Sequence, residues 1–218
     1  ISVKTYNFGQ KALAFAVTHS IPHKNVSTEI HLSGGPFTLV PLQDHDGKPS
    51  SAVVWMDKSE KAAKLMDMKE KEFEEEMTRR SCNILGPLKL ASKKSVWPII
   101  SQIADRIYSQ RLALIGETAH VVPPIGAQGL NMSLADIKLL SDLNKKYPDE
   151  LGSTHSLTEY QKNRIADIRQ RVIGVSTLNH ISISENKVVQ NIRAFGLENF
   201  FQVPAVKNSA MKLGLGYS

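Results

Sequence analysis

The first third of the chain contains short runs, either mainly apolar or alternating between apolar and polar positions, that are separated by turn residues. These runs are Lys11–Ser20, Ser27–Leu32, Phe37–Leu42 and Ser51–Met56. The breaks between them contain Gly-Gly-Pro and the stretch QDHDGKPS. Runs of this length at intervals of about ten residues predict an antiparallel sheet. The proline at position 41 indicates that the third run ends a strand or lies at a sheet edge.

Apolar residues then recur at three- and four-residue steps, which predicts helices. The predicted helices are Lys58–Cys82, Asn131–Leu143, Leu157–Ile183 and Glu185–Phe195. The first begins near two candidate capping residues, Ser59 and Asp57, and its many Lys and Glu residues predict a solvated face. The stretch from Asn83 to Ser101 is expected to be a connection followed by a strand.

A short apolar run, Arg111–Ile115, predicts a buried strand that ends at a glycine-rich segment. The order of the elements therefore predicts an α+β fold in two parts. Residues 1–105 are expected to form an antiparallel-rich sheet domain with a helix. Residues 106–218 are expected to form a domain of a strand, a loop and helices.

The glycine-rich segment, from Gly116 to Asp136, reads GETAHVVPPIGAQGLNMSLAD. A helix that begins near Gly129 has first N–H groups without intrahelical partners, and its dipole adds partial positive charge there. Small residues before the helix let a ligand approach the backbone closely. The segment is thus suited to an anion or to the electron-rich edge of a ring. Neither G-x-x-x-x-G-K-[ST] nor G-x-G-x-x-G is present, so a phosphate cradle is not expected.

This segment, together with the two residues before it, resembles the second flavin motif of the FAD-dependent aromatic hydroxylases, and within them most resembles the ubiquinone-biosynthesis hydroxylases. The family pattern is G-D-x-A-H-x-x-x-P, then G-Q-G-x-N, then an Asp. The matching residues are Gly116, Ala119, His120, Pro124, Gln128, Gly129, Asn131 and Asp136. Further similar stretches are GGPFTLVPL, SSAVVW, NILGPL and LTEYQKNR. The resemblance covers most of the chain.

The resemblance implies that FAD is the cofactor and that residues 106–218 are the C-terminal part of an FAD-binding α/β domain. Glu117 stands where the family has the Asp that binds the ribityl or pyrophosphate region, and Pro124 would pack near the reactive edge of the flavin. The implied cofactor-binding residues are Gly116, Glu117, Pro124, Gly126, Ala127, Gln128, Gly129, Leu130 and Asn131. The implied substrate-pocket residues are Phe37, Leu39, Pro41 and Trp55. His120 is expected to hold the turn and Asp136 to be structural, and no catalytic residue is assigned.

The implied activity is hydroxylation of an aromatic ring, with a polyprenyl phenol or quinone precursor as the substrate and NAD(P)H as the electron donor. Two features depart from the family. Glu117 is one methylene longer than the family's Asp, and the N-terminal G-x-G-x-x-G that binds the ADP half of FAD is missing. The chain is therefore expected to be the C-terminal part of a longer enzyme. By itself it is expected to be inactive and to bind FAD weakly or not at all.

Composition limits which partners, metal sites and cellular locations are expected. The net charge is +6, but the basic residues are scattered and only 6% of residues are aromatic, so no nucleic-acid partner is expected. The histidines show no metal spacing, and the single cysteine, Cys82, is interpreted as a small apolar filler. No apolar run approaches the roughly 20 residues that cross a bilayer. A cytoplasmic location is expected, with peripheral contact to the inner membrane or to a multi-enzyme biosynthetic complex left open.

Two other functions remain open at this point. The chain could be a binding or assembly module without redox chemistry, and an upstream G-x-G-x-x-G in the same reading frame would argue against that. A different flavin-dependent enzyme of the same fold, such as a reductase or a halogenase, is the second alternative. A halogenase would require a lysine near the flavin tunnel, for which no position is assigned.

Overall fold

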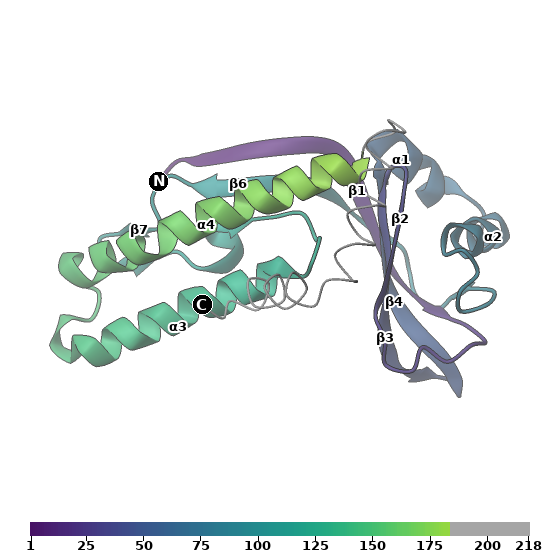
Figure 1. Cartoon of the computed structure of the whole chain (residues 1–218), viewed down its shortest axis with the longest axis horizontal. Coiled ribbons are helices and arrows are strands. Elements are labelled where there is room, and N and C mark those ends of the chain that lie inside the picture. The colour runs from purple at the N-terminus through teal and green to yellow at the C-terminus, as the bar shows by residue number, and fades with distance from the viewer. Residues whose placement is uncertain (184–218) are drawn as a thin grey trace, which may run out of the picture. The chain divides into compact units, whose positions relative to one another are not determined.

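The computed structural model describes residues 1–183 (Figure 1). The strands are β1 Val3–Thr18, β2 Thr28–Leu32, β3 Gly35–His45, β4 Lys48–Lys58, β5 Lys89–Leu90, β6 Ser95–Ala104, β7 Tyr108–Ser109, β8 Leu112–Ala113 and β9 His120–Val121. The helices are α1 Ser59–Asp67, α2 Glu70–Arg80, α3 Gln128–Lys146 and α4 Thr154–Ile183, with 3-10 turns η1 Gly116–Thr118 and η2 Pro148–Glu150. The predicted α+β fold is confirmed, while the helix predicted at Glu185–Phe195 lies outside the described residues.

The main sheet has the order β2-β3-β4-β1-β6-β9, and β5 also pairs with β1. The pairs β2–β3, β3–β4 and β1–β4 are antiparallel, as the alternating pattern predicts. A two-residue turn joins β3 to β4, and its residues Asp46 and Gly47 have φ of 50° and 71°. Positive φ at both positions is the geometry that an Asp-Gly turn in a hairpin favours.

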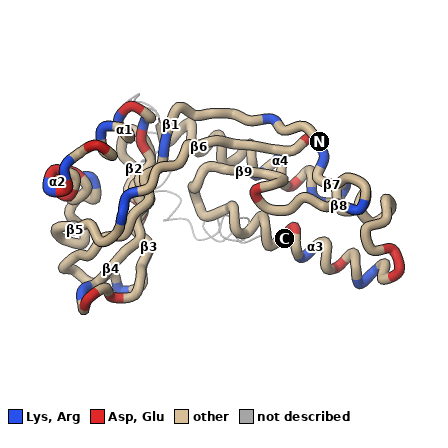
Figure 2. The backbone as a smooth tube through the Cα atoms, turned by 180° about the vertical axis from the view of Figure 1, so that it is seen from behind, with Lys and Arg blue, Asp and Glu red and all other residues tan. Residues whose placement is uncertain are grey.

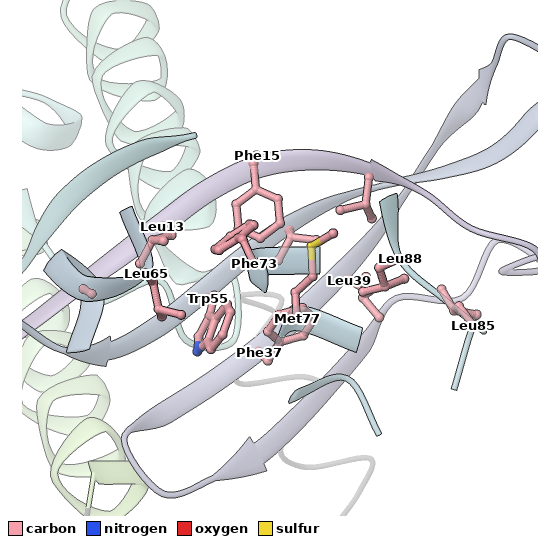
Figure 3. Close-up of a cluster of buried hydrophobic side chains, with 13 residues drawn as sticks. Leu13, Phe15, Phe37, Leu39, Trp55, Leu65, Phe73, Met77, Leu85 and Leu88 are labelled. Atoms are coloured by element: carbon pink, nitrogen blue, oxygen red, sulfur yellow. The ribbon is translucent and has the colours of Figure 1, made fainter. Parts of the chain in front are cut away.

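The chain divides into two compact units. One consists of Ile1–Asn7 and Ile100–Ile181, and the other is built on Phe8–Ile99. In the second unit, side chains from one face of the sheet pack against α1 and α2 (Figure 3). The core residues at less than 2% exposure include Leu13, Phe37, Leu39, Trp55, Leu65, Phe73 and Met77.

The structure corrects the predicted helix Lys58–Cys82, which is two helices. Met68 and Lys69 have extended backbone, with ψ of 142° and 147°, and separate α1 from α2. Neither predicted capping residue caps α1, because Lys58 occupies that position and makes no side-chain capping bond. The Ser59 hydroxyl donates instead to the carbonyl of Gly9 at 2.9 Å. The charged residues of α2 carry both signs, as expected of a solvated face (Figure 2).

The core of the first unit lies between α3, α4 and the strands β6 to β9. Its buried residues are Ala104, Ile107, Ala119, Met132, Leu143, Tyr160 and Ile168. The predicted buried strand Arg111–Ile115 is wrong in extent, because only Leu112–Ala113 pairs, with Tyr108–Ser109, and Ile115 is exposed. Within residues 1–183 no helix combines the length and the apolar character needed to span a membrane.

Candidate cofactor site

The glycine-rich segment starts with the turn η1, which is fixed to α3 through its first residue. Gly116 has φ +56° and is buried, and its backbone N–H donates to Asp136 Oδ2 at 2.9 Å. A Cβ at Gly116 would lie only 3.1 Å from the Ser133 hydroxyl. Glycine is therefore favoured here both by the backbone angle and by the close approach of Ser133.

Asp136 is a fully buried carboxylate that accepts three hydrogen bonds. Besides the N–H of Gly116, His120 Nε2 donates to Oδ2 at 2.8 Å and Arg164 Nε donates to Oδ1 at 2.7 Å. Burial acts to raise the pKa of Asp136, but the bonds from His120 and Gly116 and the charge of Arg164 outweigh it. The pKa of Asp136 is consequently lowered, and the carboxylate stays ionised in the interior.

His120 is held inside the protein. Its Nε2 donates, because its partner is a carboxylate, which can only accept. Its Nδ1 atom is buried and has no hydrogen-bond partner in the described part of the chain. The contact with Asp136 fixes the turn, and the ring is too deeply buried to reach a substrate at the surface.

The second half of the segment ends at the N-terminus of α3. Ala127, the residue before the helix, has left-handed backbone angles of φ 51° and ψ 35° and makes no side-chain capping bond. Gly126 and Gly129 are exposed, and a Cβ on Gly129 would meet nothing within 4 Å. The helix thus presents N–H groups and the positive end of its dipole next to two exposed glycines, and the space around Gly129 is open. This geometry fits the electron-rich edge of a flavin ring.

The other predicted cofactor residues lie in η1, in the loop before α3 and in the first turn of α3. Glu117 and Pro124 are exposed, and among residues 1–183 no hydrogen bond or ion pair engages the Glu117 carboxylate. Leu130 is 69% exposed, and Asn131 is half-buried. The structure therefore keeps the predicted residues together in one unit, whereas Gly116 faces inward and contacts α3.

The predicted substrate-pocket residues lie in the other unit. Phe37, Leu39 and Trp55 have 1% or less of their surface exposed and pack in the core under α1 and α2. Pro41, on the same strand as Phe37, is half-buried. As the structure stands, the three core side chains face the helices, and their assignment to a pocket stays a prediction.

Three charged residues of α4 were missed by the sequence analysis. Arg164 Nη2 donates to the carbonyl of Met132 at 3.0 Å, and the same guanidinium contacts Asp167. Arg171 Nε donates to Asp167 Oδ1 at 2.9 Å. The spacing of these residues, i, i+3 and i+7, places them on one face of the helix and was a usable signal. No group of three or more His, Cys, Asp or Glu suited to a metal occurs within residues 1–183.

Comparison with protein families gives one broad match. The family described as an FAD binding domain matches residues 2–173, which include the whole glycine-rich segment and most of α4.

Two curated relatives are informative. Ubiquinone hydroxylase UbiL of Rhodospirillum rubrum is 28% identical over 170 residues, which cover 77% of this chain and 39% of that protein. Ubiquinone biosynthesis monooxygenase COQ6 of Homo sapiens is 25% identical over 247 residues, covering 95% and 51%. The chain spans about half the length of the curated relatives it matches.

Solved structures share the fold at low identity. The p-nitrophenol 4-monooxygenase PnpA of Pseudomonas putida has a TM-score of 0.75 at 15% identity, covering 100% of this chain and 56% of that chain. The flavin-dependent halogenase CmlS has a TM-score of 0.64 at 13% identity, covering 92% and 39%. At these identities the neighbours establish the fold alone.

Proposed function

The chain belongs to the FAD binding domain family of the FAD-dependent aromatic hydroxylases, and from this premise we propose that it is the C-terminal part of a monooxygenase. The enzyme would hydroxylate the aromatic ring of a polyprenyl phenol or quinone precursor in ubiquinone biosynthesis. Bound FAD would supply the chemistry, taking electrons from NAD(P)H and activating oxygen so that one oxygen atom reaches the ring.

The observation that carries the proposal is the uncapped N-terminus of α3. Its first N–H groups follow the left-handed Ala127, and the open space at Gly129 leaves room for a flat ring edge. Partial positive charge at a helix start stabilises an electron-rich edge, and reduction of a flavin increases the electron density there. Glu117, exposed one residue after Gly116, would accept hydrogen bonds from the hydroxyls of the ribityl chain.

The proposed substrate follows from the names of the relatives, several of which are ubiquinone hydroxylases or monooxygenases. An apolar substrate needs an apolar surface, and the sheet of the second unit carries apolar side chains, Val54 and Ala14 among them, on the face opposite α1 and α2. Val54 lies there, paired with Ala14 on β1 and with Thr38 on β3, and all three are half-buried. We propose this face, rather than Phe37 and its core neighbours, as the side that receives the ring.

We propose that this chain carries only the part of the FAD site that contacts the flavin, and not the part that binds ADP. Leu130, Leu134 and Ile137 are 69%, 53% and 50% exposed and form one stripe of α3 by their spacing. Ile137 also lines a hollow of about 500 Å³ with Ile115 and Leu140. We propose that a dinucleotide-binding half covers this apolar stripe and supplies the ADP site, so that residues 1–218 alone bind FAD weakly and are inactive. A cytoplasmic location, with peripheral contact to the inner membrane or a biosynthetic complex, belongs to the same proposal.

Two experiments test the proposal. The native protein, with its N-terminus sequenced, is expected to purify with bound flavin and to convert a polyprenyl phenol into a product one oxygen atom heavier, dependent on NAD(P)H and O₂. Absence of flavin and of oxygen transfer from the native protein would contradict the enzyme function. Separately, FAD added to purified residues 1–218 is expected to be lost on dialysis, and a tight yellow complex would contradict the proposal that this chain lacks the ADP part of the site.

The native protein and its reaction product also distinguish the proposed function from two alternatives. If the native chain begins where this sequence begins and contains no upstream G-x-G-x-x-G, a binding or assembly module without redox chemistry is favoured. A halogenase or another flavin enzyme shares the fold, as the similarity to CmlS illustrates. The product separates these chemistries, because a halogenase would add a halogen from halide where a hydroxylase adds oxygen.

A further inference from the structure

A continuous series of polar contacts connects the buried Asp136 to the start of α3. Arg164 donates to Asp136 at 2.7 Å and also contacts Asp167. Arg171 Nε donates to Asp167 at 2.9 Å, and Arg171 Nη1 donates to Gln128 Oε1 at 2.8 Å. The series therefore runs along one face of α4 and ends on the first residue of α3.

Gln128 uses both ends of its side-chain amide within the protein. Its oxygen accepts from Arg171, and its Nε2 donates to the carbonyl of Gly126 at 3.0 Å. The guanidinium can only donate, so the contact with Arg171 determines which end of the amide faces Gly126. The residue between them, Ala127, has φ 51°, a left-handed backbone conformation that is unfavourable for residues other than glycine. The side-chain amide of Gln128 thus bonds across Ala127 to Gly126 and holds the turn in this unfavourable backbone conformation.

The charges of this series also favour an electron-rich ligand at the start of α3. The series holds two arginines and two aspartates and is formally neutral, so the positive end of the α3 dipole is not offset by an excess of carboxylates. Removing the positive charge of Arg171 would leave an uncompensated negative charge on the helix face next to Gln128. That charge would oppose the approach of an electron-rich ligand.

We propose that Arg171 is a positioning residue for the cofactor site: through Gln128 it fixes the Gly126–Gly129 turn so that the first N–H groups of α3 face the flavin. This inference rests on the proposed function for the identity of the ligand. It also changes the role of Gln128, whose side chain holds the turn, while the backbone of residues 128 and 129 is left to contact the cofactor.

The test uses backbone amide NMR on residues 1–218 with three variants. Arg171→Gln removes the charge and the two donors, and Gln128→Leu removes the same contact from its other partner. Arg171→Lys keeps the charge and a donor but not the planar guanidinium that donates to Asp167 and Gln128 together. The matched control is Arg169→Gln, because Arg169 is exposed on the same helix and makes no hydrogen bond or ion pair among residues 1–183. Gln128→Leu also serves if Arg171→Gln does not fold.

In Arg171→Gln and Gln128→Leu the amide resonances of Gly126, Gln128 and Gly129 are expected to shift, because the turn loses one charge-assisted hydrogen bond that holds it. FAD titrated into each variant should bind about tenfold more weakly than to the wild type. The FAD affinity of Arg171→Lys should lie between that of the wild type and that of Arg171→Gln. Loop resonances of Arg171→Gln and Gln128→Leu that are identical to those of Arg169→Gln would overturn the inference.

The outcome for the proposed function is read separately. If FAD shifts no amide of the wild-type loop even at high concentration, the flavin site in this chain fails. The effect of Arg171→Gln on the loop without ligand would still decide whether Arg171 positions it.

Discussion

His120 Nε2 lies 2.8 Å from Asp136 Oδ2, and neither side chain has more than 1% of its surface exposed. The same carboxylate accepts from the N–H of Gly116 and from Arg164. One residue of α3 therefore joins the turn before it and the helix α4 behind it. The conformation of the glycine-rich segment depends on this buried charge, because its two ends are held by Asp136 and by the contacts that continue from Arg164.

Asp136→Ala should destabilise the protein severely. The substitution leaves the buried guanidinium of Arg164 without its main partner and removes the acceptor of His120 and Gly116. Loss of one member of a buried ion pair costs about 3–5 kcal/mol. Urea denaturation followed by circular dichroism measures the free energy of unfolding of the variant and the wild type.

The matched control for that prediction is Asp142→Ala on the same helix. Asp142 is exposed and pairs with Lys138 at 2.6 Å in an i, i+4 arrangement. Exposed pairs of this kind contribute little, so no measurable change in the urea midpoint is expected. Equal losses in the two variants would show that the position on α3, and not burial of the charge, determines the cost.

The stability of the wild type should fall more steeply in acid than that of Asp136→Asn. The pKa of Asp136 is lowered in the folded protein, so its contribution is fully present above the pKa of the unfolded carboxyl, about 3.9, and is lost as pH falls through the lower folded value. Asn at this position does not titrate. The urea midpoints of the two proteins, measured from neutral pH down to below about pH 3, should converge at the acid end. Parallel curves would contradict the prediction.

Local patterns were sufficient to predict much of the fold. Phe37 and Leu39 alternate with Thr38 and Val40, and the structure places the first two in the core, as period two requires. The pattern does not say what covers each face, and the assignment of Phe37, Leu39 and Trp55 to a substrate pocket rests on the family resemblance alone. Arg111–Ile115 shows a second limit, since an apolar run of five residues gives no information on whether neighbouring strands pair along its whole length.

Long-range contacts account for what the sequence did not reveal about the site. Arg164 and Asp136 are 28 residues apart, and nothing in the spacing of the two indicates that α3 and α4 bring them to 2.7 Å. The motif did predict that α3 starts near Gly129. The break between α1 and α2 at Met68 and Lys69 was missed because it contains neither glycine nor proline, the usual signals for such a break.

Gly34→Ala should destabilise the second unit. Gly34 has φ +97°, and a Cβ there would lie inside contact distance of the carboxylate of Asp57, which is buried and paired with Lys61 at 2.9 Å. The expected cost is the backbone strain of about 1–2 kcal/mol plus a similar amount for the displaced carboxylate. Thermal and urea denaturation of the variant give the total.

Gly47→Ala separates the two parts of that cost. Gly47 has φ +71°, but a Cβ there would meet nothing within 4 Å. Only the backbone strain should appear, so Gly47→Ala should be the milder change. The additional cost of Gly34→Ala should disappear when it is measured in an Asp57→Ala background, and its persistence there would place the clash elsewhere.

Gly129→Ala should change stability and cofactor affinity in opposite directions. Gly129 lies in the first turn of α3 and a Cβ there meets nothing, so alanine should raise the free energy of unfolding by about 0.5–1 kcal/mol through its higher helix propensity. If the flavin edge approaches this N-terminus, the added methyl group occupies the same space, and FAD should bind about tenfold more weakly. The control is Gly174→Ala on α4, also helical and also open around its Cβ. It should give the same gain in stability with no change in FAD affinity. A Gly129→Ala variant that gains stability and keeps its affinity for FAD would mean that the flavin does not contact the start of α3.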